Sequence, residues 1–479
     1  MADYKWKPIE DLPDDWTKLA SSELGGLAAV WVEHYETIKD SKALKQFNER
    51  LRREWAIETG IIENLYYIDR GVTLTLIEKG IEASLIPHGS TDRPAELIVP
   101  ILKDHEEVVT GLFDFVGQQR QLSTSYIKQL HQALTQHQRT TAAKDNFGTM
   151  MEVELLRGDW KKLPNNPTKS DDSIHEYCPP EQVASEMDRL ISLHQEHLEK
   201  GVPPEVEAAW LHHRFTQIHP FQDGNGRMAR TLASLVFLRA GLFPLVVHLE
   251  DRDLYLDVLF EADFGDLKPI VQFFSRAQKK AINQALGLSE NVLLEATAVE
   301  QVISVGVERL RERKRRQAYN KQPSLIVSKL EQITQEKLVI IANRLDSNLK
   351  EVDSKYSAQA VEETDNLIYD AFDLPAIRIS RKAGYLFNPY SYKSWFTLRI
   401  QQDEESLLVV SIHTVGLKSA GINAVSAFYF SISNEEYFAL SDEVFQFTQN
   451  EPEESVIERF NIWLDEVILN GLSYWQQQL

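Results

Sequence analysis

Apolar residues recur at three- and four-residue intervals over residues 24–86 and again over 95–288. This spacing places them along one face of a helix, so it predicts amphipathic α-helices in both stretches. The second stretch is broken at 165–172 and 223–226, where Pro, Asn, Asp and Gly favour turns. We therefore predict a mainly α chain in which a helical N-terminal segment, 1–94, precedes a large helical domain, 95–288.

One part of the helical domain has a different pattern. Residues 158–163 and 174–178 flank the loop PNNPTKSDDS, whose Pro and Asn residues do not continue a helix easily. This arrangement predicts a β-hairpin, or flap, at about 157–178. Pro179 and Pro180 then suit the start of the next helix.

The last third of the chain changes from helical to strand-like sequence. Runs rich in β-branched and aromatic residues predict an antiparallel sheet, and a helical period returns near the end. The runs are SWFTLRI, SLLVVSIHTV and AVSAFYFSIS, and the late helical stretch is SVIERFNIWLDEVILNGL. We predict a separate C-terminal α+β domain over 325–479, joined by a helical linker at 289–324. The sequence does not indicate the role of this domain.

Length and charge limit the classes of partner. The chain has 479 residues, more than the ~250–300 that one core usually holds, so several domains are expected. Its formal net charge of −21 disfavours binding to nucleic acid or to an anionic membrane, since both carry negative charge. The basic run Arg309–Arg316 is more typical of a solvated helix face or linker than of a binding site.

Cysteine usage and hydropathy point to a compartment. Cys178 is the only cysteine, so the chain forms no intrachain disulfide and no cysteine-rich zinc site. The first residues, MADYKWKPIEDLPDDW, lack an apolar signal region, and no run of about 18 apolar residues occurs. These features predict a cytoplasmic protein without a membrane partner.

The candidate chemistry lies in HPFQDGNGRMAR, residues 219–230, between two helical patterns. Pro220 ends the preceding helix, and the Asp-Gly-Asn-Gly tract allows a tight turn whose backbone N–H groups can point at one spot. A helix that begins near Asn225 adds its dipole and its unpaired N–H groups, which makes an anion-binding site.

The charged side chains of this stretch suit a polyphosphate. Arg227 and Arg230 are three residues apart on one helical face and supply charge-assisted donors to phosphate oxygens. Asp223 offers the carboxylate oxygen that Mg²⁺ prefers, and His219 can take a proton from an attacking hydroxyl. Any one of these residues alone is more typical of an ordinary loop, but together they predict nucleotidyl transfer.

The sequence resembles the Fic family, because 219–230 matches its signature H-x-F-x-[D/E]-G-N-G-R-x-x-R at every specified position. Residues 122–134, LSTSYIKQLHQAL, look like the family's core helix, and 252–274 look like the segment that follows the motif. The resemblance covers roughly 95–288 and leaves the C-terminal third unexplained. It implies an all-helical core with a flap, ATP as the substrate, Mg²⁺ as the cofactor, and transfer of AMP to a protein target.

The resemblance also implies a role for each motif residue. His219 is the base that activates a Ser, Thr or Tyr hydroxyl, Phe221 packs into the core, and Asp223 binds Mg²⁺. Arg230 holds the γ-phosphate. The α- and β-phosphates are cradled by four consecutive residues, Gly224, Asn225, Gly226 and Arg227.

Two further positions follow from the resemblance with looser matches. The stretch 157–178 corresponds to the flap that holds the target segment by strand addition, although a surface hairpin without a partner fits the residues equally well. Tyr255 is a candidate for lining an adenine pocket, but a tyrosine at helical spacing is more often a core residue.

An inhibitory element is implied by residues 59–64. One class of the family carries [S/T]-x-x-x-E-[G/N] on a helix before its core, and its glutamate pairs with the second arginine of the signature. Thr59, Glu63 and Asn64 match this pattern in a helical segment. We predict that Glu63 neutralises Arg230 and takes the place of the γ-phosphate, while an ordinary surface helix is the alternative. Gly60 between them is expected to weaken the helix or to mark its start.

Other functions stay open from the sequence alone. Removal of AMP from a modified target is the second enzymatic reading, since Glu63 can orient a water molecule over the same phosphate cradle. Transfer of phosphate is disfavoured, because the motif has GNGR where phosphate-transferring relatives have GNGK. A binding module that senses nucleotide is a third reading. Self-modification and a homodimer are expected from the family rather than from any residue of this chain.

Overall fold

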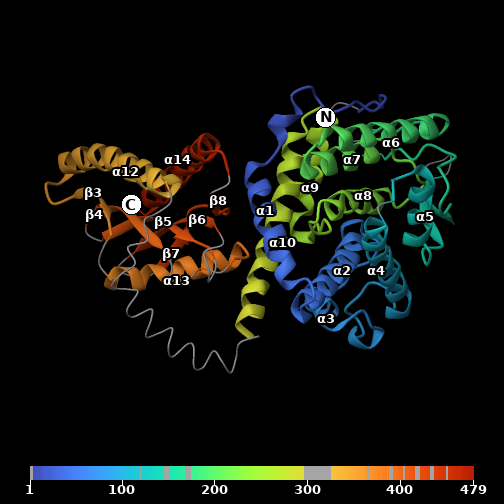
Figure 1. Cartoon of the computed structure of the whole chain (residues 1–479), viewed down its shortest axis with the longest axis horizontal. Helices are drawn as coiled ribbons and strands as arrows, with labels where there is room; N and C mark the ends of the chain where they lie inside the picture. The colour runs from blue at the N-terminus through green and yellow to red at the C-terminus, as the bar shows by residue number, and fades with distance from the viewer. Residues whose placement is uncertain are drawn as a thin grey trace. The chain divides into compact units, whose positions relative to one another are not determined.

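The computed structural model describes the residues in the following ranges: 4–118, 120–144, 150–167, 174–295, 325–363, 366–385, 387, 392–402, 405–415, 421–431, 436–448 and 451–478. The basic run at 309–316 and most of the predicted linker at 289–324 lie outside them. The mainly α architecture with a small hairpin and a C-terminal sheet is confirmed (Figure 1).

The chain forms two compact units. The first contains residues 1–21 and 45–279, and the second contains 22–44 and 280–479. The helices α2 and α10 each pass from one unit into the other. The proposed boundaries at 94 and 288 therefore remain predictions, and residues 22–44 group with the C-terminal part.

The first unit is built from helices. Its α-helices are α2 (Lys42–Ile62), α3 (Arg70–Lys79), α4 (Ala95–Gly117), α5 (Thr124–Leu134), α6 (Val183–Lys200), α7 (Pro204–Ile218), α8 (Asn225–Arg239), α9 (Arg252–Asp263) and the first part of α10 (Lys268–Glu295). Short 3₁₀ helices are η1 (Trp16–Leu19), η2 (Ala83–Leu85), η3 (Pro180–Gln182) and η4 (Leu249–Asp251).

The helices α7 and α8 form the centre of this unit. Nearly every residue of both is buried, including Trp210, Phe215 and Phe237, each with no exposed side-chain area. A helix that is buried all round is held by packing rather than by one amphipathic face. The segment 219–224 that joins them carries the sequence motif, so the motif sits on a rigid support.

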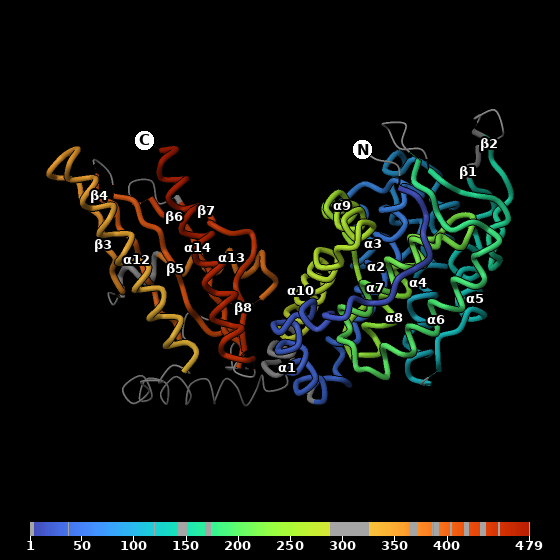
Figure 2. Tube along the Cα trace, turned by 90° about the horizontal axis from the view of Figure 1, so that it is seen from above, coloured from blue at the N-terminus to red at the C-terminus, as the bar shows by residue number. Residues whose placement is uncertain are grey.

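The predicted flap lies elsewhere in the chain. The described hairpin pairs β1 (Thr140–Lys144) with β2 (Met150–Glu154) in antiparallel register, and it extends from the unit in Figure 2. The described parts of 157–178, which are 157–167 and 174–178, contain no hairpin, so that prediction was wrong. Lys161 instead donates its backbone N–H to Pro220 O at 2.8 Å, which makes this stretch a brace for the motif loop.

The first described residues, Tyr4–Leu12, form a segment that we call the N-terminal strap. It runs along α6 and α7 and buries Ile9 completely (Figure 2). Its Asp11 Oδ1 lies 2.6 Å from His197 Nε2, and His197 Nδ1 lies 2.6 Å from Glu207 Oε2. His197 therefore joins the strap to a buried carboxylate.

This bridge predicts a pH-dependent contribution to stability. Burial alone would lower the pKa of His197, but Glu207 and Asp11 outweigh burial and raise it. The bridge then stabilises the fold fully at pH values below about 6.5, the pKa of His197 in the unfolded chain. This stabilisation is lost as the pH rises through the higher pKa of His197 in the folded chain. We expect His197→Gln to lower the urea midpoint clearly at about pH 6 and much less at about pH 9. An equal loss at both pH values would contradict the charged bridge.

The second unit contains the predicted antiparallel sheet. Its strands are β3 (Ser357–Glu362), β4 (Lys393–Gln401), β5 (Glu405–Thr414), β6 (Ile422–Ser431), β7 (Glu436–Ala439) and β8 (Phe445–Thr448). The order is β3-β4-β5-β6-β7, with β8 also paired to β6, and every pairing is antiparallel. The helices are α1 (Ser22–Ile38), α12 (Leu325–Val352), α13 (Asn366–Lys382), α14 (Glu453–Gln477) and the end of α10.

Helices cover both faces of this sheet. Apolar residues of α12 and α14 pack on one face, and residues of α13, including Phe372, pack on the other (Figure 1). Helix α1 approaches β8 so closely that a Cβ on Gly26 would lie 2.5 Å from Thr448 Oγ1. Among the described residues, no helix is long and apolar enough to cross a membrane.

Candidate functional site

The motif loop has the backbone shape that its sequence suggests. His219 ends α7 in the left-handed conformation with φ 52°, and Gly224 precedes α8 with φ 80°. A side chain at Gly224 would be strained at this φ, and its Cβ would lie 3.3 Å from Arg227 Nη2 and from His131 Nε2. The loop therefore delivers the N-terminus of α8 to the site, where its unpaired N–H groups favour an anion.

Asn225 and Phe221 fix the shape of this loop. The Asn225 amide donates to Phe221 O at 2.8 Å and accepts from Phe221 N at 2.9 Å. Asn165 donates to the same carbonyl at 2.8 Å. Because the Asn225 side chain is occupied in this way, only its backbone remains to face a phosphate. Phe221 is fully buried, as predicted for it, and its ring stacks on His131 with centroids 3.7 Å apart.

His219 is held as a neutral imidazole. Its Nδ1 lies 3.2 Å from Thr216 O, and because a carbonyl can only accept, Nδ1 carries the proton and Nε2 carries the lone pair. Burial, with a further contribution from Lys161, lowers the pKa of His219 to about 3. At neutral pH the ring is therefore unprotonated on Nε2, and its lone pair there is available to a hydroxyl proton.

Asp223 is an ionised carboxylate held by several donors. Its Oδ2 accepts from Gln138 Nε2 at 2.7 Å and from Thr141 Oγ1 at 2.9 Å, and its Oδ1 accepts from Gly224 N. Burial alone would raise the pKa of this carboxyl, but Arg227 and the three donors outweigh burial and lower it. The carboxylate is thus charged and fixed in orientation.

Arg227 has unused donors in a buried position. Its side chain is 1% exposed, and Nη2 donates to Gln138 Oε1 at 2.7 Å. Its Nε and Nη1 have no hydrogen-bond partner among the described residues. A buried guanidinium with unpaired N–H groups is costly, and an anion would satisfy it.

These residues fit a polyphosphate with a divalent cation. The unpaired donors of Arg227 and the N-terminus of α8 suit phosphate oxygens, and the hard carboxylate of Asp223 suits Mg²⁺. Among the described residues, no group of three or more His, Cys, Asp or Glu could hold a metal by itself. Mg²⁺ usually keeps waters and substrate phosphates as most of its ligands.

Gln138 couples the two charged groups, and its removal is predicted to weaken nucleotide binding. Gln138→Leu leaves Asp223 Oδ2 and Arg227 Nη2 each without one hydrogen bond. A loss of about 1–1.5 kcal/mol, or roughly tenfold in affinity for Mg²⁺-ATP, is expected. Titration calorimetry with and without Mg²⁺ measures it, with the exposed Gln118→Leu as the control. Unchanged affinity would show that neither charge depends on this bridge.

The predicted inhibitory residues meet Arg230. Its Nη1 lies 2.8 Å from Glu63 Oε1, its Nε donates to Thr59 Oγ1 at 2.9 Å, and its Nη2 donates to Thr59 O at 2.8 Å. Arg230 is 1% exposed, whereas the Glu63 side chain is 31% exposed. Burial alone would lower the pKa of Arg230, but Glu63 and Tyr255 raise it. Thr59 and Glu63 therefore engage donors on each side of the guanidinium.

The Glu63 carboxylate also lies against the start of α8. A Cβ on Gly226 would be 2.2 Å from Glu63 Oε1, so the carboxylate occupies the space beside this glycine. Asn64 follows the end of α2 with φ 53°, a conformation that Asn and Gly adopt more easily than other residues. This explains physically why Asn fits the last position of the inhibitory pattern.

Gly60 does not mark a helix start. It lies inside α2, and a Cβ there would be 2.1 Å from the Tyr66 hydroxyl, which donates to Ile57 O at 3.1 Å. The glycine is needed so that the Tyr66 ring can pack on the helix. Gly60 thus lets Tyr66 pack against the inhibitory residues 59–64 and fix them in place, instead of making them easier to displace.

Tyr255 lies behind Arg230. Its ring is 2% exposed, and its hydroxyl lies 2.7 Å from His212 Nε2 and 3.4 Å from Arg230 Nη1. Tyr255 is therefore a buried neighbour of Arg230, and its role as part of an adenine pocket remains a prediction.

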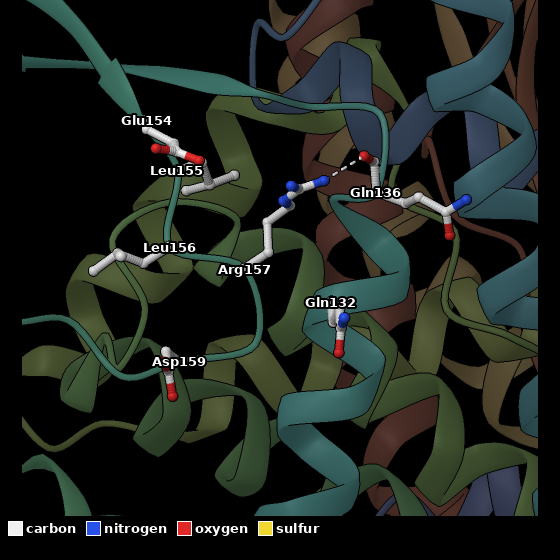
Figure 3. A pocket seen from close by; sticks show the side chains of 7 residues that line it. All are labelled: Gln132, Gln136, Glu154, Leu155, Leu156, Arg157 and Asp159. Carbon is white, nitrogen blue, oxygen red and sulfur yellow. Dashed lines mark hydrogen bonds between the residues drawn. The ribbon is translucent and has the colours of Figure 1, made fainter.

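A polar pocket of about 500 Å³ opens at the base of the hairpin (Figure 3). Arg157 crosses it and donates from Nη1 to Gln136 O at 2.8 Å. The pocket is lined by Gln132, Gln136, Glu154, Leu155, Leu156, Arg157 and Asp159.

The hairpin also contacts Asp223, the candidate metal ligand, because Thr141 of β1 donates to its carboxylate.

Sequence reasoning missed two residues that build the site. His131 accepts from Gly158 N at 2.9 Å on Nδ1 and donates to Asp223 O at 2.9 Å from Nε2. Burial lowers its pKa to about 4, so it stays neutral. Gln138 links Asp223 to Arg227. A polar residue on the buried face of the predicted helix 122–134 was the available signal for His131, and none pointed to Gln138.

Comparisons with known proteins agree with the motif. Residues 121–237 match the sequence profile of the Fic/DOC family. The chain is 39% identical over 79 residues to protein adenylyltransferase Fic of Nematostella vectensis. This match covers 16% of this chain and 18% of that protein. It is also 31% identical over 118 residues to protein adenylyltransferase fic-1 of Caenorhabditis elegans, and this match covers 24% of this chain and 23% of that protein. The matched parts are thus less than a quarter of these relatives.

Solved structures of Fic proteins are also similar. A Fic domain containing signaling protein from Bacteroides thetaiotaomicron aligns with a TM-score of 0.46 at 22% identity, covering 57% of this chain and 97% of that chain. Fic-1 from C. elegans aligns with a TM-score of 0.43 at 20% identity, and the alignment covers 57% of this chain and 72% of that chain.

Proposed function

We propose that this chain, which contains a Fic/DOC family domain, is a protein adenylyltransferase that moves AMP from ATP to a Ser, Thr or Tyr hydroxyl of a protein target. In this reaction the target oxygen bonds to the α-phosphorus, the bond to the β-phosphate oxygen breaks, and pyrophosphate leaves. The hydroxyl proton goes to His219 Nε2.

The observation that carries the proposal is the pairing of a proton acceptor with a set of anion-binding donors. His219 begins the short loop 219–224, and Arg227, with its unpaired donors, lies in the first turn of α8 directly after that loop. That loop also presents the N-terminus of α8. Such a site holds a phosphate and activates a hydroxyl next to it, and most of its catalytic effect comes from positioning and charge neutralisation.

Mg²⁺ is part of this proposal. Asp223 is the residue that would hold it, and the donors on Asp223 fix the direction of its carboxylate. When bound, the ion would neutralise charge on the phosphates.

The position of a radioactive label in ATP tests the reaction. We expect label on the α-phosphate to be incorporated into protein and label on the γ-phosphate to remain in solution. Incorporation of the γ-label would instead indicate phosphate transfer and would contradict the proposal.

Autoinhibition by Glu63 is proposed from its ion pair. The carboxylate takes one donor of Arg230 and the space beside Gly226, so a γ-phosphate would meet a negative charge at the same place. Activity at rest is therefore expected to be low, and ATP either binds weakly or binds with its α-phosphate displaced.

Removal of AMP is the second candidate, and the same glutamate favours it. The Glu63 side chain is partly exposed beside the cradle, so it can hold a water molecule for attack on the phosphorus of a modified target. Loss of label from a pre-modified target that requires Glu63 would identify this activity. Label that stays on the target in the presence of the wild-type protein would exclude it.

The target is proposed to dock along the hairpin β1–β2 and the pocket at its base. Free strand edges bind extended segments through backbone hydrogen bonds, and the polar pocket offers room for a side chain. Self-modification, a homodimer and a cytoplasmic location remain predictions, the last supported by the single, buried Cys178.

A further inference from the structure

The N-terminal strap is held by polar side chains that are themselves buried. Glu186 accepts from Ile9 N at 2.8 Å, and Trp210 and Arg214 each donate to Glu10 O at 3.0 Å. Gln217 donates to the Tyr4 hydroxyl at 2.7 Å. These partners belong to α6 and to α7, the helix that ends at His219. Buried polar groups need partners, so the strap is an integral part of this face.

A row of aromatic rings connects the strap to His219. Tyr4 stacks on His175 with centroids 4.4 Å apart, and Glu176 N donates to Tyr4 O at 3.0 Å. His175 lies 4.8 Å from Tyr177, whose ring stacks on His219 at 3.7 Å with planes only 7° apart. Each ring therefore limits the rotation of the next ring in the row.

His219 needs such a support. Its hydrogen bond to Thr216 O is 3.2 Å long, at the weak end of the normal range, and a single bond leaves the ring free to rotate about it. Its backbone φ of 52° is unfavourable for a residue with a side chain, so the surroundings must hold it. The Tyr177 ring supplies a second constraint by fixing the plane of the imidazole.

We propose that Tyr177 is a positioning residue for His219, and that the N-terminal strap holds Tyr177 in place through His175. This inference rests on the proposed AMP transfer, in which Nε2 of His219 must point at the target hydroxyl. The contact is made by the ring face, because the two ring planes lie parallel within 7° at a centroid distance of 3.7 Å. The ring, rather than the hydroxyl, is then what the reaction requires.

The test compares Tyr177→Phe with Tyr177→Leu, each in a Glu63→Gly background. We expect Tyr177→Phe to keep kcat within about twofold, and Tyr177→Leu to lower it about tenfold or more with the KM for ATP nearly unchanged. Tyr4→Ala, which removes a ring outside the site, should lower kcat by about threefold. Thermal unfolding midpoints show whether each variant is folded.

An equal loss in Tyr177→Phe and Tyr177→Leu would overturn the proposal, since the hydroxyl would then matter. A loss confined to the KM for ATP would also overturn it. If the Glu63→Gly protein transfers no AMP at all, the proposed function fails instead. The inference is then judged by long-range ¹H–¹⁵N spectra of His219, which should show one neutral tautomer in Tyr177→Phe and mixed tautomers in Tyr177→Leu.

Discussion

Glu63→Gly is expected to raise AMP transfer by about tenfold or more over the wild-type protein. In the wild-type structure, Thr59 and Glu63 together engage Nε, Nη1 and Nη2 of Arg230. The substitution breaks the ion pair at Nη1 and removes a negative charge from the place where a γ-phosphate would lie. Labelling of protein by α-³²P-ATP, measured over time in gels, gives the ratio of rates.

Glu63→Gln provides a matched control because it keeps the size of the side chain and removes its charge. If repulsion of the phosphate is the cause, Glu63→Gln should raise transfer nearly as much as Glu63→Gly. If occupation of the space beside Gly226 is the cause, only Glu63→Gly should do so. No increase in either variant would contradict the inhibitory role.

His219→Ala is expected to lower AMP transfer by a factor of about 10²–10⁴, which is the usual contribution of a general base. The substitution removes the imidazole whose Nε2 lone pair is proposed to take the hydroxyl proton. Binding of Mg²⁺-ATP should change little, because the phosphate donors on Arg227 and α8 stay in place. The measurement is kcat in the Glu63→Gly background.

The exposed His88→Ala is the control for this substitution, and it should leave transfer unchanged. A normal rate in His219→Ala would exclude this residue as the base. A large loss of ATP affinity would mean that His219 mainly shapes the cradle.

The candidate site was largely predictable because its residues are close in sequence. Within 219–230 the local turn and the helix start bring the groups together, so the order of residues nearly determines their geometry. Glu63 was predictable only from a short pattern, since its partner Arg230 is distant in sequence. Gln138 carried no signal at all, because its role exists only once the loop before β1 meets Asp223.

The fold shows where periodicity misleads. Runs such as SLLVVSIHTV became strands as predicted, because a buried central strand is apolar throughout and rich in β-branched residues. The hairpin was misplaced because Pro and Asn at 164–167 look like a turn between strands, whereas Asn165 in this stretch donates to Phe221 O and so supports the motif loop. Helix α1 looked like part of an N-terminal segment, and only tertiary packing places it with the C-terminal sheet.

The placement of α1 has a consequence for how the chain is synthesised. Ser22 and Glu23 of this helix leave the ribosome 433 and 436 residues before their respective partners, Ser455 and Arg459. Helix α1, which contacts β8 at Gly26, therefore stays without that strand while the residues between them are synthesised. Contacts of such high sequence separation form slowly and leave apolar surface open to aggregation or to chaperones. Fragments that keep α1 but lack the C-terminal sheet should inherit that exposure permanently.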